Sequence, residues 1–456
     1  MSESLQRRLT PRHITFMALG MCIGAGLFLG SASTIRLAGP SVLFAYLFGG
    51  AMIFIIMRAL GEMAAHEPIA GSFATYAHKY LGPFAGYLTG WNYWILMMGV
   101  GIAESTAVGI YMKAWFPELP QWIWAFGSVA MIGGLNLMAV KVYGELEFWF
   151  ALIKVLTVVL MILGGATIIW LGWGNGGHPM GLSNLWTHGG WFPNGITGMV
   201  LALPVLVFSF GGIETIGMAA AEAAHPERTI PRAVNSVIWR ILIFYVGALF
   251  VIMAIYPWNQ LDANSSPFVS TFAKLGIPQA AGLINFVVIT AALSSFNSTT
   301  FSGSRMLHSL ASKGQAPAAM GRLSAHGVPV PGVLVTLVFL LFGVVMNYLV
   351  PGRIFGMMMS ILAFNTVWTW GMVLIAHWCF RQRQVVPLAF RLRAWPLSSV
   401  ACLAFLAFVW VMLGYSPDTR VALYVGVGWI ALLSLAYKLF GIGRNIQVAE
   451  VVSAAP

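Results

Sequence analysis

The chain has 456 residues, of which 59% are hydrophobic and 8% are charged, and its formal net charge is +11. An average soluble domain carries about 25% charged residues, so this chain has too few to cover the surface of a soluble fold. The composition excludes a cytosolic enzyme and a disordered chain, and three cysteines are too few for a secreted disulfide scaffold. We expect a helical protein that crosses a membrane many times.

Twelve apolar segments follow one another along the chain, and each is long enough to span a bilayer, which takes about 20 residues. Their limits are 13–35, 40–65, 83–113, 121–139, 145–172, 195–221, 233–256, 279–311, 330–350, 354–379, 396–416 and 419–440. The connections are short and leave no room for a soluble domain. The sequence thus predicts an all-α membrane protein with twelve transmembrane helices, forming a single domain over 1–456.

Basic residues predict the orientation of these spans. With the N-terminus inside the cell, 18 of the 24 lysines and arginines fall on the cytoplasmic side, five fall outside, and Lys154 lies within a span. Basic residues gather on the cytoplasmic side of membrane proteins, so we expect both termini to be cytoplasmic. The same rule explains the positive net charge without a nucleic-acid partner.

Closely spaced glycines interrupt two of the predicted helices, within Ile23–Gly26 of the first span and Phe208–Gly212 of the sixth. Glycine lowers helix stability by about 1 kcal/mol relative to alanine, although either cluster alone could serve close helix packing. Such a pair, in the first and sixth spans, is typical of a transporter built from two inverted repeats. We expect repeats at 13–172 and 195–379, followed by two additional helices at 396–440.

An interrupted helix leaves peptide N–H and C=O groups without partners in the middle of the membrane. Such groups are costly in hydrocarbon unless they line a polar cavity. Free N–H groups at a helix N-terminus attract a carboxylate, and free carbonyls attract an ammonium. Since a zwitterionic amino acid carries both charges, the two interruptions predict an amino-acid-binding site.

Ionisable residues within the spans are the next candidates, because burying a charge there costs at least a few kcal/mol. Lys154, in the fifth span, could gain and lose a proton, replace a bound sodium ion as a fixed ammonium, or reach the cytoplasmic interface. Glu214, directly after the glycines of the sixth span, could carry a proton or cap the broken helix. Glu104, in the third span, could line the site or the proton path, or pair with a polar group of the bundle.

Three further features have two interpretations each. Glu222, near the cytoplasmic end of the sixth span, fits an inner-gate salt bridge better than a proton carrier. Phe208, one turn before the sixth-span glycines, could be an aromatic lid over the substrate or a core residue. Polar residues of the eighth span could bond neighbouring helices or form the wall of a cation or proton site facing Lys154; they are Ser294, Ser295, Asn297 and Ser298.

Other chemistries have little support in the sequence. The chain lacks a zinc-protease motif and a phosphate-binding Walker loop. No set of nucleophile, base and metal ligands is visible. We therefore expect neither an enzyme nor a bound cofactor or metal.

Short motifs of a known family occur in order along the chain. They are Ile23–Phe28, Ala38–Pro40, Arg58–Met63, Gly71–Phe73, Gly90–Trp94, Tyr143–Trp149, Pro231–Ala233, Trp239–Arg240 and Tyr256–Asn259. On these motifs, residues 7–440 resemble the bacterial amino acid transporter family of the amino acid–polyamine–organocation superfamily. The resemblance implies a LeuT-like fold, with two inverted five-helix repeats, broken helices 1 and 6, and two further helices.

The resemblance also implies roles for individual residues. Relatives hold the substrate's carboxylate and amine at the two interruptions, a role that falls on Ile23, Gly24, Ala25 and Gly26 and on Phe208, Ser209, Phe210 and Gly211. Phe208 matches the aromatic lid, and Lys154 matches the lysine that replaces a bound cation in proton-coupled relatives. The acidic residues match positions common in the family, with Glu104 expected at the substrate and Glu214 and Glu222 in proton coupling.

Two sets of motifs disagree about the substrate. Thr366–Trp370 and Gly414–Arg420 look most like permeases for proline or histidine. Trp91–Trp94 and Glu104–Thr106 look more like permeases for threonine and aromatic amino acids. The side chain of the substrate is therefore left open between these classes.

The sequence predicts a proton-coupled symporter that imports a neutral or aromatic-type L-amino acid across a bacterial inner membrane by alternating access. Proline or histidine is favoured, with threonine or an aromatic amino acid as the other choice. The alternatives are an exchanger without net proton coupling and an amino acid sensor or channel. The expected partners are the amino acid, the proton and the lipid bilayer, and the oligomeric state is left open.

Overall fold

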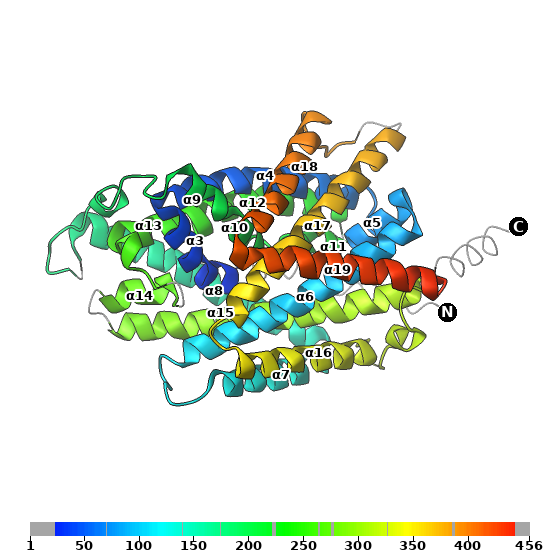
Figure 1. The fold of residues 1–456 in the computed structure, drawn as a ribbon, viewed down its shortest axis with the longest axis horizontal. Coiled ribbons are helices and arrows are strands. Elements are labelled where there is room, and N and C mark those ends of the chain that lie inside the picture. Colours follow the sequence, from blue (N-terminus) through cyan, green and yellow to red (C-terminus); the bar gives the residue numbers. More distant parts are fainter. Residues whose placement is uncertain are drawn as a thin grey trace, which may run out of the picture.

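A computed structural model describes residues 23–442, except 70, 139, 174, 221–224, 263–264, 275–277, 326 and 385–387. Every regular element in these residues is helical (Figure 1). The first half of the described chain contains α2 (Ala25–Phe28), α3 (Gly30–Ala38), α4 (Val42–His66), α5 (Ser72–Leu81), α6 (Pro83–Met112), α7 (Gln121–Asn136), α8 (Val140–Leu171), α9 (Gly195–Leu201), α10 (Leu203–Ser209) and α11 (Thr215–Ala219). The second half contains α12 (Pro226–Arg240), a π-helical turn (Ile241–Gly247), α13 (Ala248–Ile255), α14 (Pro267–Lys274), α15 (Pro278–Ser312), α16 (Val330–Leu349), α17 (Ile354–Arg383), α18 (Leu397–Tyr415) and α19 (Pro417–Leu439). The prediction of an all-helical chain is confirmed for this part.

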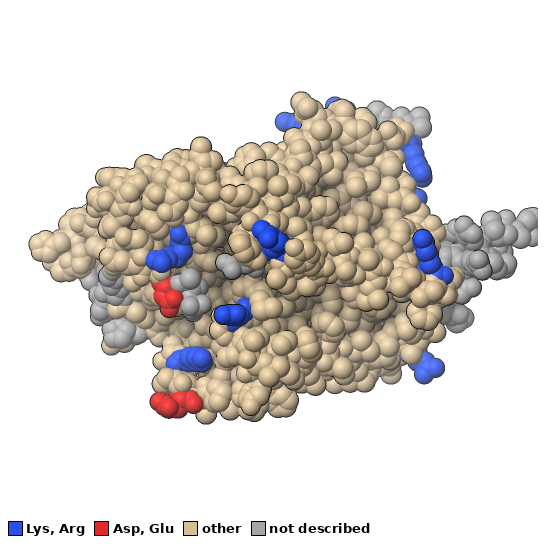
Figure 2. All heavy atoms as spheres, in the orientation of Figure 1, with Lys and Arg blue, Asp and Glu red and all other residues tan. Residues whose placement is uncertain are grey.

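The surface of the molecule fits a lipid environment. Nine helical segments of the described chain are long and apolar enough to cross a membrane. Large apolar side chains point outward on them, such as Val338, which is 70% exposed, and Leu171, which is 68% exposed. Figure 2 shows a face on which lysine, arginine and acidic side chains occupy a small part of the area. These features identify a multi-pass membrane protein.

The predicted spans correspond to these segments with three differences. The 42-residue segment Ala25–His66 joins the second half of the first predicted span to the second span through a 3-10 turn, Gly39–Ser41. The fourth predicted span is the 16-residue α7, and the sixth is divided among α9, α10 and α11. The count of twelve spans and the repeat boundaries remain predictions.

Helices from distant parts of the sequence meet at the centre of the molecule. The long helices α6 and α15 lie side by side (Figure 1), and α15 also contacts α2 and α8. In turn, α10 packs against α2, α3 and α17. This arrangement brings both predicted interruptions next to α6 and α15.

An ion pair fastens α4 to α17 away from this centre. The carboxylate of Glu62, which is fully buried, accepts a hydrogen bond of 2.9 Å from Arg381 and one of 2.5 Å from the backbone N–H of Leu392. The Nε2 atom of His377 lies 3.1 Å from the same carboxylate. Since Arg381 and His377 belong to α17, one carboxylate joins two helices and a loop.

Candidate functional site

The sixth predicted span is interrupted at its glycine pair. Helix α10 ends at Ser209, turns occupy Phe210–Glu214, and α11 begins at Thr215. Gly212 has a φ of +96°, which an L-residue with a side chain adopts only with strain. The glycine therefore permits a sharp turn that removes helical hydrogen bonds inside an apolar segment.

The first predicted span is described only from Ile23 onward, because residues 13–22 lie outside the described residues. Helix α2 begins at Ala25, and Gly24 before it is extended, with φ −131° and ψ −159°. The N–H of Ala25 therefore starts a helix in the interior of the molecule and needs an acceptor from another element.

The two interruptions touch each other through Ser209. Its hydroxyl lies 3.0 Å from the carbonyl oxygen of Gly26, to which it can donate a hydrogen bond. A Cβ atom on Gly26 would lie 3.0 Å from Ser209 Cα and 3.3 Å from Phe208 Cε1, so glycine allows this approach. The carbonyl of Ser209, freed at the end of α10, accepts a hydrogen bond of 2.6 Å from Tyr245.

Two buried carboxylates accept hydrogen bonds from backbone N–H groups at the interruptions. Both oxygens of Glu104, from α6, lie 3.1 Å from the Ala25 nitrogen, which donates to them. Both oxygens of Glu214 lie 3.1–3.2 Å from the Gly212 nitrogen, and Trp370 Nε1 donates to one of them at 3.3 Å. Glu214 thus binds an amide of the turn itself, while α11 begins without a side-chain cap. Both roles open to Glu214 from the sequence remain predictions.

A pocket lies between the interruptions and α6, α15 and α17. Six of the nine residues predicted to bind substrate line it, namely Gly24, Gly26, Glu104, Phe208, Ser209 and Gly211. The other lining residues are Leu96, Met97, Val100, Gly212, Glu214, Ser295, Thr299 and Thr366. The pocket therefore combines an apolar wall from α6 with backbone groups and carboxylates from the two interruptions.

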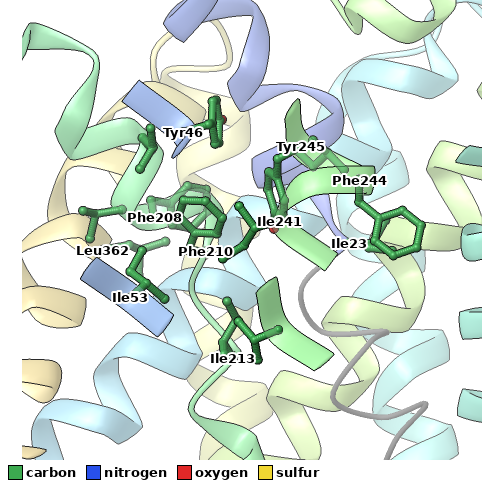
Figure 3. Close-up of a cluster of buried hydrophobic side chains, with 14 of the residues drawn as sticks. Ile23, Tyr46, Ile53, Phe208, Phe210, Ile213, Ile241, Phe244, Tyr245 and Leu362 are labelled. Atoms are coloured by element: carbon green, nitrogen blue, oxygen red, sulfur yellow. The ribbon is translucent and has the colours of Figure 1, made fainter. Parts of the chain in front are cut away.

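Three predicted residues do not line the pocket. Ile23 and Ala25 are buried beside it, and Ala25 acts through its backbone N–H. The Phe210 ring packs against Tyr46 and Tyr245, with centroids 5.5 Å and 4.6 Å apart. Figure 3 shows this ring within the apolar cluster, and only the backbone of Phe210 belongs to the turn.

Leu96, Val100 and Thr299 line the pocket and were not predicted, yet their spacing from predicted residues is a recognisable signal. Leu96, Val100 and Glu104 are spaced four residues apart and lie on one face of α6. Ser295 and Thr299 have the same spacing on α15. Thr366, from α17, has no comparable signal.

The remaining candidates lie outside the pocket. Lys154 is fully buried in α8, where a lysine that reaches the interface would be exposed. It interacts electrostatically with Glu104 and with Glu147, a fully buried carboxylate of the same helix that was noted only within a family motif. Glu222 lies outside the described residues.

Comparisons with known proteins identify the family of this chain. The family model described as amino acid permease matches residues 13–443. The chain is 52% identical to the uncharacterized amino acid permease YtnA of Bacillus subtilis, over 99% of this chain and 98% of the relative. It is 48% identical to the probable threonine/serine transporter YbxG of the same organism, over 98% and 97% of the two chains. It is also 46% identical to the aromatic amino acid transport protein AroP of Escherichia coli strain K12, over 95% of each.

A helical membrane protein with a pocket at an interrupted helix is the general form of a secondary transporter. Within that class, the extent of the match shows that this chain belongs to the amino acid permease family.

Proposed function

We propose that this protein is a proton-coupled symporter that imports a neutral L-amino acid across a bacterial inner membrane by alternating access. The proposal includes twelve spans, two LeuT-like inverted repeats and cytoplasmic termini. The main support is a pocket that is lined by residues of Gly24–Gly26 and Ser209–Gly212 and by two buried carboxylates, Glu104 and Glu214.

The pocket suits a zwitterion with an uncharged side chain. Leu96, Met97, Val100 and Phe208 offer apolar surface, and the described lining contains no lysine, arginine or histidine. The relatives named for threonine, serine and aromatic amino acids support the class that the third-span motifs indicate. We therefore favour a hydroxylated or aromatic amino acid over proline or histidine.

In this mechanism the two interruptions hold the charged ends of the substrate. The Ala25 N–H is suited to the carboxylate once Glu104 releases it, and carbonyl groups of the turn Phe210–Glu214 are suited to the ammonium. Phe208 closes over the substrate, and rocking of the helices then opens the cytoplasmic side, with Glu222 at the inner gate. Glu214, which also lines the pocket, is the other proposed proton-binding group in this mechanism.

Coupling to protons depends on Lys154 in this proposal. Its buried ammonium lies within electrostatic reach of Glu104, which lines the pocket and holds the Ala25 amide. The charge of Lys154 therefore acts on a residue that borders the substrate. Through Glu104, the occupancy of the pocket and the protonation of the buried charges influence each other.

The deciding experiment is uptake of radiolabelled amino acids into proteoliposomes with an imposed pH gradient and no sodium. We expect accumulation that collapses with the gradient, and Lys154→Ala should abolish accumulation while it leaves part of the exchange activity. Dependence of uptake on sodium, or full accumulation by Lys154→Ala, would contradict the assignment. Counterflow without net uptake would indicate an exchanger, and currents far above transporter turnover would indicate a channel.

A further inference from the structure

A third buried carboxylate, Glu147 of α8, lies outside the pocket and has no role in the mechanism above. Its side chain is fully buried. The Ser294 hydroxyl, from α15, donates a hydrogen bond of 2.8 Å to Oε1. Among the described residues the Oε2 atom has no hydrogen-bond partner. A buried carboxylate oxygen without a donor is costly when the group is ionised.

Consecutive serines of α15 bind this carboxylate and Glu104. Ser294 bonds Glu147, and the next residue, Ser295, bonds Glu104. Consecutive Cα atoms are about 3.8 Å apart, so one turn of α15 holds carboxylates from two different helices. Lys154, two helical turns or about 10 Å along α8 from Glu147, interacts electrostatically with both.

The charges of these three groups do not balance. Two ionised carboxylates and one ammonium sum to one negative charge, and an unbalanced charge in an apolar interior is unfavourable. One added proton makes the set neutral. Among the described residues, Tyr111 also interacts electrostatically with Glu104, and it is uncharged as a phenol.

The hydrogen bonds decide which carboxylate takes that proton. Glu104 receives the Ala25 N–H on both oxygens and the Ser295 hydroxyl, and such donors stabilise an ionised carboxylate. Glu147 interacts with the hydroxyls of Ser294 and Ser298, but among the described residues it receives no backbone N–H, and its Oε2 atom meets no donor at hydrogen-bond distance. Protonation of Oε2 removes the charge from the atom that has no donor.

We propose that Glu147 binds and releases the transported proton, while Lys154 remains an ammonium between the two carboxylates. In the loaded set Glu147 is a neutral carboxyl, and Glu104 supplies the single negative charge that balances Lys154. Release breaks the Glu147 O–H bond, gives one proton to water, and leaves two carboxylates beside one ammonium. The inference rests on the proposed proton-coupled function and predicts one proton for each zwitterion.

The transport test compares Glu147→Gln, Glu147→Asp and the wild type in proteoliposomes. The glutamine keeps the size and the bond to Ser294 but cannot release a proton. We expect its pH-driven accumulation to fall at least ten-fold relative to its counterflow exchange, and the aspartate to restore part of the accumulation. A ratio of accumulation to exchange that equals the wild type in Glu147→Gln would overturn the inference. If the wild type itself shows no pH-driven uptake, the proposed proton coupling is wrong. This result differs from one in which only the role of Glu147 is wrong, because the wild type then still accumulates substrate.

A second measurement does not require transport, so it tests the inference even if the Glu147→Gln variant folds but is inactive. Infrared difference spectra of the purified protein between acidic and alkaline buffer report carboxyl groups that lose a proton. We expect part of the protonated-carboxyl band to disappear in Glu147→Gln. The matched control is Glu62→Gln, which removes a buried carboxylate that is already paired with Arg381 and should leave the band unchanged. An unchanged band in Glu147→Gln would show that another group holds the proton.

Discussion

Replacing Gly24 by alanine tests how closely the start of α2 approaches Glu104. The new Cβ atom would lie 2.3 Å from Glu104 Oε1 and 3.0 Å from Ser295 Oγ. Separations below 3.0 Å are essentially never found around real Cβ atoms. The carboxylate therefore has to retreat by roughly 1 Å to reach ordinary van der Waals contact.

A retreat of this size breaks the bond between Glu104 and the Ala25 N–H, which is 3.1 Å long. Beyond about 3.5 Å the contact is no longer a hydrogen bond. A hydrogen bond to a charged group contributes about 1.5–3 kcal/mol, and crowding of a packed interior costs about 1–3 kcal/mol. We expect Gly24→Ala to lower the free energy of unfolding by about 3 kcal/mol.

A double-mutant cycle with Glu104→Ala isolates the contact, with unfolding followed in mixed micelles. Without the carboxylate only the crowding against Ser295 remains, so Gly24→Ala should cost at least about 1 kcal/mol less in that background. Gly371→Ala in α17 is the control, because a Cβ there would meet nothing within 4 Å. An equal cost of Gly24→Ala in both backgrounds would refute the reasoning.

Three further predictions concern other parts of the molecule. Thr366→Val removes a pocket hydroxyl that has no partner among the described residues; uptake competition should show about ten-fold weaker binding of hydroxylated substrates and little change for aliphatic ones. Burial lowers the pKa of Lys313, just after α15, to about 8 from 10.5. Between these pH values the unfolded chain holds a proton that the folded chain has lost, so stability should rise with pH, and less so in Lys313→Met. Glu62→Ala should lower the free energy of unfolding by about 3 kcal/mol, because Arg381 loses its partner.

Features that depend on local sequence could be predicted. The turn at Phe210–Glu214 follows from a glycine pair in an apolar segment, since glycine accepts the positive φ that Gly212 has. The apolar runs likewise gave the positions of the long helices α6, α8 and α15 to within a few residues. The π-helical turn at Ile241–Gly247 lies in an unbroken apolar run and has no such signal.

Features that depend on packing could not be predicted. Phe210 is in the expected turn, but its ring faces Tyr46 and Tyr245 because α4 and the π-helical turn pack on that side. Thr366 reaches the pocket only because α17 packs against α10. The direction of a side chain in a turn, and the helix that covers it, are set by the tertiary structure and leave no local pattern.

The position of Glu104 connects two groups of residues that the sequence shows separately. It lines the pocket together with Phe208, it accepts a hydrogen bond from the Ala25 N–H, and it interacts electrostatically with the buried Lys154. A carboxylate in this position responds both to a ligand that competes for the Ala25 amide and to the charge state of Lys154 and Glu147. Because thermodynamic coupling is reciprocal, a substrate that displaces Glu104 from the amide must also change the affinity of the buried charges for a proton.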